Sequence, residues 1–468
     1  MSDGEHEREE AKQPRGSLWW RGVHVLVLGL VGAAGCAPEP SRPHVVLVTA
    51  DALRADHLSV NGYPRHTSPN IDAFAGESWN FAQATSVIPK TGPSFATLFT
   101  GRHPREHGVR ANFAALPAEI PTLAERLRTL GYRTAAFVSN PVLRESMGFA
   151  RGFEVYELSP QRDGVRNVNR SFFRWGREPW DEPTFAWLHY IDPHGPYAPP
   201  REFEAIFIDD QWARSDERVV LDATPPARGT PNKLLGAVPL YQQREGEDRL
   251  SVYVARYDAE IRFVDAAFGE VLAFLRERDL YDDSLVIFTS DHGESLGEHD
   301  LYFEHGWFAY EPSLSVPLMI KLPKQRAGGV VPDLASHLDL LPSLLALLDA
   351  PVDAGAPGTD LFEPPGGRPP LVIENSDRYP EKYLGARTLR WKYLRRVSDG
   401  SEELYDLRED PGEIRSLERS EPERLAGMRE SFEEALRTLS RSAVAPATPA
   451  PSDDAETLNR LEALGYVQ

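Results

Sequence analysis

Two aspartates and a histidine stand directly after apolar runs that are typical of buried strands. Asp51 ends the run "HVVLVTAD", and Asp291 and His292 follow the run "SLVIFTS". Carboxylate oxygens and an imidazole nitrogen together are ligands that suit Zn²⁺ or Mn²⁺. An aspartate after a strand is also a common helix N-cap, so Asp51 alone leaves both interpretations open. The Asp291–His292 pair is the stronger signal, whereas His299 and His305, which follow in "GEHDLYFEHG", could equally face solvent.

Thr91 is the candidate nucleophile. It stands in "KTGPSFATLFTG", which is typical of a turn that becomes a helix, and the start of a helix favours an anion. A threonine hydroxyl attacks poorly until a base or a metal ion lowers its pKa. A divalent ion held by Asp51, Asp291 and His292 would do that and would also bind anionic substrate oxygens. The alternative is that Thr91 only caps the helix.

The elements that must position these residues alternate between strands and helices. "HVVLVTAD", "TFAWLHYIDPH" and "SLVIFTSDHGE" each join an apolar strand to a polar cluster. A helix ending at Gly131 precedes a further strand, and a long amphipathic helix, residues 252–280, leads into the strand at Ser284. Such alternation predicts an α/β fold with a doubly wound, mostly parallel sheet. Because ligands bind beyond the carboxyl ends of such strands, the three polar clusters are expected to converge.

The remaining sequence predicts a series of smaller parts. Residues 44–355 are expected to form the catalytic domain, with a surface excursion or lid between Tyr197 and Glu247. Residues 356–440 are expected to form a smaller C-terminal α+β subdomain with an antiparallel hairpin and a charged helix from about residue 422 to 440. A low-complexity linker and a short terminal helix, "AETLNRLEALGYV", make up residues 441–468.

Composition and the N-terminal segment point to the cell envelope. The 468 residues carry a net charge of −20, which argues against general nucleic-acid binding. The one cysteine, Cys36, excludes an internal disulfide and follows a short apolar run and "AAG", as in a bacterial lipobox. Residues 1–36 are therefore predicted to be a lipoprotein signal ending at a lipidated Cys36, and residues 37–43 a tether. The alternatives are an ordinary cleaved signal or an N-terminal anchor. The predicted location is the periplasmic or extracellular side, anchored to the membrane by lipid.

Seven ordered stretches resemble the sulfatase family of the alkaline-phosphatase superfamily. They are "VLVTADALRADHLSVNGYPRHTSPNIDAFA", "TGPSFATLFTGRHPREHGVRAN", "LHYIDPHGPYAPP", "IFTSDHGESLGEH", "YEPSLSVPLMIK", "EELYDLREDPGE" and "LEALGYV". The resemblance implies an alkaline-phosphatase-like fold, Asp51, Asp291 and His292 as metal ligands, and Thr91 at the nucleophile position. It also implies that His194 contacts the transferred or leaving group. His305 stands near a family lysine or histidine at the substrate, and Asn112 is expected to line the pocket.

The sequence departs from the family pattern at several positions. Sulfatases of this family convert the first residue of C/S-x-P-x-R into formylglycine, but Thr91 cannot become that aldehyde and Phe95 replaces the arginine that supports it. Ala52 stands where the family has a second aspartate, and His292 follows Asp291 where asparagine is usual. This set resembles a threonine-type branch that is similar to phosphodiesterases and lipid phosphoethanolamine transferases.

The leading hypothesis is a sulfatase-like hydrolase that cleaves a sulfate or phosphate ester of a small molecule, glycan or lipid. It would use one divalent metal ion, Ca²⁺, Zn²⁺ or Mn²⁺, with Thr91 as a metal-activated nucleophile that also binds the ion. One alternative is a transferase that passes a phospho-group to a lipid or glycan. Another, of a different class, is a non-catalytic binding lipoprotein.

Overall fold

A computed structural model describes residues 42–160, 164–215, 217–221, 235–353, 356–363 and 368–447, together with 459, 461–463 and 465. Cys36 and almost all of the predicted tether lie outside the described residues, as do most of the linker and of the terminal helix. The described residues from Arg42 onward belong to one compact unit. The domain boundaries expected at residues 355 and 440 stay predictions. No helix in the described part of the chain is both long enough and apolar enough to cross a membrane.

The central sheet has eight strands among the described residues, in the order β12-β2-β11-β8-β1-β5-β3-β4. In that order they are Gly329–Ser336, Trp79–Thr85, Leu318–Lys321, Ser284–Ser290, His44–Asp51, Thr184–Pro193, Arg133–Val138 and Val155–Leu158. Only β11 runs antiparallel to its neighbours β8 and β2; the other paired strands are parallel. The predicted mostly parallel α/β sheet is therefore confirmed.

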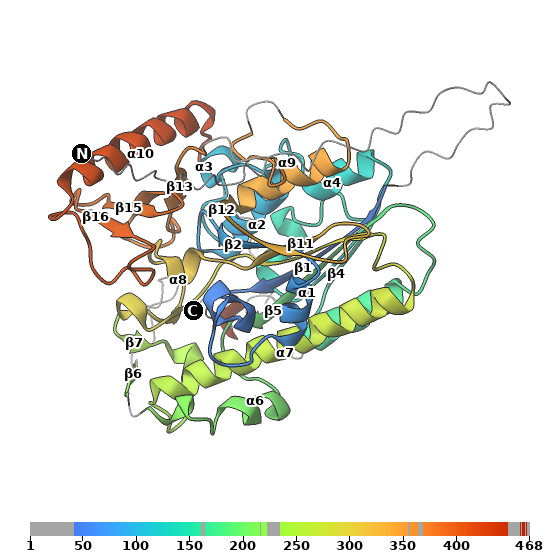
Figure 1. Ribbon diagram of the computed structural model, residues 1–468, viewed down its shortest axis with the longest axis horizontal. Coiled ribbons are helices and arrows are strands. Elements are labelled where there is room, and N and C mark those ends of the chain that lie inside the picture. Colours follow the sequence, from blue (N-terminus) through green and yellow to red (C-terminus); the bar gives the residue numbers. More distant parts are fainter. Residues whose placement is uncertain are drawn as a thin grey trace, which may run out of the picture. The chain divides into compact units, whose positions relative to one another are not determined.

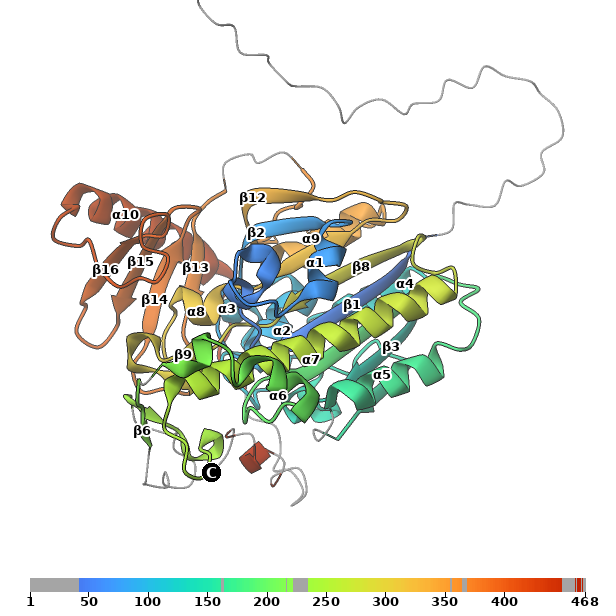
Figure 2. The ribbon, with the colours of Figure 1, turned by 60° about the horizontal axis from the view of Figure 1, so that its bottom comes forward.

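Helices cover both faces of this sheet, which is why its central strands are apolar throughout. Val46 and Val48 of β1 face the core shared with α1 (Pro69–Ala75), α5 (Gly164–Trp175) and α7 (Leu250–Glu277). Val45 and Leu47 face the opposite core, shared with α2 (Thr91–Thr100), α4 (Leu123–Thr129) and α9 (His337–Leu347). Figures 1 and 2 show α7 along one face and α2, α4 and α9 on the other. Strands buried on both faces read as unbroken apolar runs, and this explains the pattern seen in the sequence.

A second, antiparallel sheet of four strands carries the C-terminal part of the described chain, in the order β13-β14-β15-β16. Its strands are Leu371–Glu374, Tyr383–Arg387, Trp391–Arg396 and Glu402–Asp406, and α10 (Pro422–Ser442) packs on it through Leu425, Met428, Phe432 and Leu439. The predicted hairpin is thus the β15–β16 pair of a larger sheet. The charged helix begins at Pro422 as expected and ends two residues later than expected.

Short elements complete the fold. They include α3 (Pro104–His107), α6 (Arg201–Phe207), α8 (Glu311–Leu314), β6 (Val220–Leu221), β7 (Ala237–Val238), β9 (Ser295–Leu296), β10 (Tyr302–Glu304) and several 3-10 turns, among them η3 (Pro141–Leu143). The expected excursion after Tyr197 contains α6, β6 and β7, and residues 222–234 within it lie outside the described residues. It contacts the body of the protein through Phe207 and Ala213, which pack on α7, and through Arg65, which binds Asp210 at 2.9 Å and the buried Asp258 at 2.6 Å.

Candidate active site

Asp51 and Asp291 lie side by side because the strands that end at them are neighbours in the sheet. Ala50 of β1 pairs with Ser290 of β8, so the next residue of each strand emerges at the same edge. The pairing of β1 with β5 slips after Ala50, and Ala52 takes a left-handed conformation with φ of 58°. Its N–H donates to Asp291 Oδ1 at 3.1 Å. The bend therefore turns both carboxylates into one buried space.

The two carboxylates are buried in a way that favours a bound cation. Both side chains are fully buried, and burial raises the pKa of Asp51 to about 7 and that of Asp291 well above its usual range. Asp51 Oδ2 accepts a hydrogen bond from Asn140 Nδ2 at 2.5 Å. Asp51 Oδ1 and Asp291 Oδ2 accept none from the described residues. Buried acceptors of this kind are expected to bind a cation or a proton.

His292 completes this group of ligands. Its Nδ1–H donates to the carbonyl of Gly293 at 2.8 Å, which leaves the lone pair of Nε2 facing the aspartates. Nε2 lies 3.4 Å from Asp291 Oδ2 and 3.9 Å from Asp51 Oδ1. One ligand atom from each of the three residues lies within 4.8 Å of the others. Burial lowers the pKa of His292, which keeps the ring neutral and able to ligate. Two carboxylates and a neutral imidazole suit a divalent ion.

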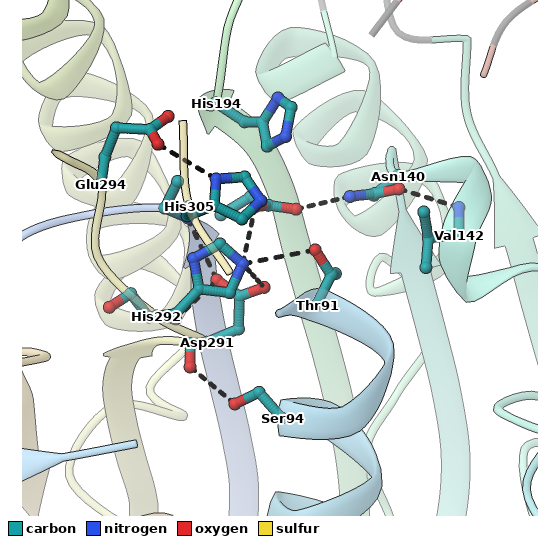
Figure 3. Close-up of polar contacts among 12 residues, drawn as sticks. Thr91, Ser94, Asn140, Val142, His194, Asp291, His292, Glu294 and His305 are labelled. Atoms are coloured by element: carbon teal, nitrogen blue, oxygen red, sulfur yellow. Dashed lines mark hydrogen bonds and ion pairs between the residues drawn. The ribbon is translucent and has the colours of Figure 1, made fainter. Parts of the chain in front are cut away.

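Thr91 points into the same space from the first residue of α2 (Figure 3). Its Oγ1 lies 3.4 Å from His292 Nε2. Lys90, in extended conformation, holds the cap position of α2, so Thr91 follows the cap and is not the capping residue. The helix is fixed to the end of β8 because Ser94 Oγ donates to the Asp291 carbonyl at 2.6 Å.

Phe95 lies one turn further along α2 and belongs to the core. Its ring is fully buried, with its centroid 5.1 Å from that of Trp187 and 4.8 Å from that of His189. The position that carries an arginine in the formylglycine motif is therefore filled here by an aromatic cluster.

His194 and His305 lie on the other side of the site from α2 (Figure 3). Their ring centroids are 5.1 Å apart, and the His305 ring is 4.2 Å from that of His292. His194 Nδ1 donates to the Gly195 carbonyl at 2.7 Å, and burial lowers the pKa of His194 to about 3. His305 Nδ1 bonds to Glu294 Oε1 at 3.0 Å, while its Nε2 has no hydrogen-bond partner in the described structure.

Of the other predicted residues, Asn112 lies next to the site and His299 lies away from it. Asn112 lies in a later loop that contacts the first turn of α2, where its Oδ1 accepts from the N–H of Gly92 at 2.8 Å. It therefore supports the helix that carries Thr91 next to the site. His299 lies elsewhere: its ring stacks on Tyr310 with centroids 3.7 Å apart, so the structure does not bring it to the carboxylates.

Four residues around the site were not identified from the sequence: Asn140, His189, Glu294 and Lys90. Asn140 follows β3, and a polar residue at that strand end was a usable signal. His189 lies inside β5, with Nε2 3.5 Å from Asp51 Oδ2, and Glu294 lies in the loop after His292. Lys90 is 4 % exposed, and its burial lowers its pKa to about 8. None of these last three has a local pattern that distinguishes it from a core or surface residue.

Comparison with known proteins adds an independent finding. A family model described as Sulfatase matches residues 43–350. The chain is 27 % identical over 424 residues to an ulvan-active sulfatase of Formosa agariphila, covering 81 % of this chain and 78 % of that protein. It is 26 % identical over 432 residues to a choline-sulfatase of Rhizobium meliloti, covering 80 % and 82 %. Among solved structures, a phosphonate monoester hydrolase of Agrobacterium radiobacter superposes with a TM-score of 0.68 at 22 % identity, over 86 % of this chain and 96 % of that one. A 2-O GAG sulfatase superposes with a TM-score of 0.69 at 21 % identity, over 87 % and 96 %.

Proposed function

Because the chain belongs to the sulfatase family and is an ester hydrolase, we propose that it cleaves its ester with Thr91 as the nucleophile and one divalent metal ion as the activator. Members of this family cleave sulfate or phosphate esters. A non-catalytic binding protein is disfavoured, since the candidate ligands and the candidate nucleophile all surround one buried space.

One observation carries the choice of nucleophile. Thr91 Oγ1 lies 3.4 Å from His292 Nε2 and beside the buried carboxylates of Asp51 and Asp291. One oxygen of each carboxylate accepts no hydrogen bond from the described residues. No cysteine or serine occupies that position, and Phe95 fills the arginine position with a core side chain. The unmodified hydroxyl of Thr91 is thus the candidate nucleophile at the start of α2, since the other hydroxyl of this turn, that of Ser94, donates to the Asp291 carbonyl.

The donor set fits a divalent ion. Asp51, Asp291, His292 and Thr91 would hold it with three oxygens and one nitrogen. When bound, such an ion lowers the pKa of a hydroxyl and stabilises the anionic oxygens of an ester. An imidazole ligand favours Zn²⁺ or Mn²⁺ over Ca²⁺, which prefers oxygen ligands alone.

The chain's own residues define the rest of the reaction. Thr91 Oγ1 attacks the phosphorus or sulfur atom, the ester bond to the leaving alcohol breaks, and that alcohol takes up a proton. Water then attacks the same atom, the bond to Thr91 breaks, and the hydroxyl regains its proton. His194 and His305 present imidazoles on the opposite side of the site, where each ring can donate a hydrogen bond to an ester oxygen once its second nitrogen carries a proton. Glu294 fixes the His305 ring through Nδ1. We favour phosphate over sulfate, since in-line water can cleave a threonine phosphoester without the second hydroxyl of a formylglycine hydrate.

Substrate class and location extend the proposal. The relatives named for ulvan and choline sulfate support an ester of a glycan or small molecule. A lipid ester and transfer of the group to a lipid or glycan acceptor remain alternatives. We also propose that Cys36, which lies outside the described residues, is lipidated and holds the protein at the outer side of a membrane.

The test combines elemental analysis with turnover of aryl phosphate and aryl sulfate esters. Thr91→Ala should abolish turnover while the protein keeps its fold and most of its metal, because three ligands remain. Thr91→Ser should keep part of the activity, because the hydroxyl survives. Acid quench followed by peptide mass spectrometry should find Thr91 phosphorylated during turnover.

Thr100→Ala is the matched control. Thr100 is a buried threonine at the far end of α2, and its Oγ1 donates to the Ala96 carbonyl at 2.6 Å. This variant should lose some stability and keep its turnover per folded molecule. Full activity in Thr91→Ala would refute the assignment and point to a metal-bound water as the attacking group.

A further inference from the structure

The C-terminal motif "LEALGYV" has no role in the proposed reaction, yet its described residues lie against the active-site loops. Asn459 and residues 461–463 are helical. Leu461 is only 1 % exposed, although Glu462 and Ala463 beside it are exposed. It packs with Val142 and Ile191, and against Phe113. The burial of this leucine anchors the residues around it to that spot.

Val142, one of the residues that surround Leu461, belongs to the turn that orients Asp51. The N–H of Val142 donates to Asn140 Oδ1 at 2.8 Å, which fixes the amide so that its Nδ2 faces Asp51. Val142 and Asn140 are both drawn in Figure 3. Leu461 therefore contacts the turn that orients one of the candidate metal ligands.

The other two contacts of Leu461, Ile191 and Phe113, belong to the end of β5 just before His194 and to the loop that carries Asn112. Ile191 precedes His194 by three residues, and its carbonyl accepts the N–H of His194 at 2.9 Å. Phe113 directly follows Asn112, which supports the start of α2. Three separate segments next to the site thus meet at one side chain, Leu461.

Gly465 forms a second anchor, and only glycine fits there. Its φ is +74°, and a Cβ at this position would lie 2.6 Å from the ring of Tyr241. Its N–H donates to the Glu462 carbonyl at 2.9 Å, which sets the turn that brings it to that ring. Tyr241 is itself tied down, since its hydroxyl donates to the Phe303 carbonyl at 3.1 Å.

The two anchors bracket the loop of His194. On one side, Leu461 covers Ile191. On the other, Tyr241 is followed by Gln242, whose side chain is so close to Gly195 that a Cβ there would meet it at 1.8 Å. Gly195 in turn accepts the hydrogen bond of His194 Nδ1.

We propose that Leu461 and Gly465 are positioning residues, which hold the His194 loop in the geometry needed for turnover. This inference rests on the proposed function only for the part that His194 takes in the reaction. It gives a role to a buried leucine and to a glycine next to Tyr241 that stand four residues apart in the sequence.

The test compares Leu461→Asp, the milder Leu461→Ala and the volume-conserving Leu461→Met in the full chain. The first two should lower kcat for the aryl ester that the protein turns over roughly 10- to 100-fold, because small displacements of a group that contacts the substrate have effects of that size. Metal content should be unchanged, and Leu461→Met should stay near wild type. Leu389→Asp, at a leucine that is 46 % exposed in the four-stranded-sheet subdomain, is the matched control and should leave kcat unchanged. Gly465→Ala should act in the same direction as Leu461→Ala.

A double-mutant cycle with His194→Ala separates positioning from general destabilisation. If Leu461 acts through His194, Leu461→Ala should cost little further activity in the His194→Ala background. An equal loss in both backgrounds, or wild-type kcat for Leu461→Ala, would overturn the inference. If Leu461→Asp does not fold, Leu461→Ala decides the outcome alone. Thr91→Ala in the same assay tests the proposed nucleophile separately, so failure of either idea leaves the other measurable.

Discussion

Removal of the metal ion should make the stability of the protein fall as the pH rises from 5 to 8. In the metal-free protein, Asp51 is buried beside Asp291 without a cation to offset its charge. Burial therefore raises the pKa of Asp51 from 3.8 to about 7. The folded protein then binds a proton that the unfolded chain has already released, so deprotonation costs folding free energy between these two values.

The size of the effect follows from the two pKa values. With 3.8 in the unfolded chain and about 7 in the folded protein, Asp51 alone withdraws about 2.6 kcal/mol of stability between pH 5 and pH 8. Asp291 shifts in the same direction. The buried histidines act oppositely: a pKa lowered to about 3 at His194 adds stability as the pH rises toward 6.5. The Asp51 effect must therefore be read as a difference between variants.

The assay is urea unfolding of metal-free wild type and metal-free Asp51→Asn at pH 5 and pH 8. The wild type should lose about 2.6 kcal/mol more than the variant over that range. Restoring the ion should abolish the loss in wild type only. Asp265, whose pKa is raised to about 6 away from the site, contributes equally to both proteins and cancels. Parallel pH curves for the two metal-free proteins would refute the reasoning.

Three further predictions test other parts of the site and the chain. Glu294→Ala should lower kcat roughly tenfold with metal content retained, because His305 loses the bond at Nδ1, and Glu294→Gln should keep more activity; equal activity of both variants with wild type would contradict this. Phe95→Ala should cost about 3–5 kcal/mol in denaturant unfolding because its ring fills the core, and a cost below about 1 kcal/mol would show that it does not. Cys36→Ser should move the protein from the membrane fraction to the soluble fraction and remove the lipid from its intact mass, whereas unchanged membrane association would count against lipidation.

The fold was predictable because its strands are buried on both faces. The runs that end at Asp51 and Asp291 are apolar without alternation, and both ends of the first run match β1. Such runs, separated by helices, leave few options besides a doubly wound sheet. Only two of the strands in the four-stranded sheet, β15 and β16, were predicted from the sequence. Its strand β13 is four residues long and follows a segment rich in proline and glycine, so nothing local indicates its partner.

The site was predictable where chemistry coincides with a strand end. Asp51, Asp291 and His292 fit that rule, whereas Thr91 was identified from the start of a helix; the structure brings all four together, although their roles stay predictions. His299 looked equivalent to His305 in the sequence. The two separate in space because a left-handed backbone at His299, with φ of 56°, turns it toward Tyr310.

Glu294 and Leu461 mark the limit of sequence reasoning. Glu294 is an ordinary acidic residue until a buried histidine bonds to it. Leu461 has the helical spacing of any terminal amphipathic helix, and its partners lie more than 250 residues earlier in the chain. Contacts that depend on such distant pairings are set by the tertiary fold and leave no local periodicity.

Because of the packing of Phe95, a single substitution at Thr91 would not be enough to give a formylglycine enzyme. Replacing Thr91 by cysteine would supply only the precursor of the aldehyde. The arginine would have to enter a space walled by Trp187 and His189, where an unpaired guanidinium would cost several kcal/mol. A lineage would need both changes, and the second alone threatens folding. If the unmodified hydroxyl acts as proposed, the protein also needs no maturation enzyme, so its gene could pass between hosts and yield active protein wherever the metal is present.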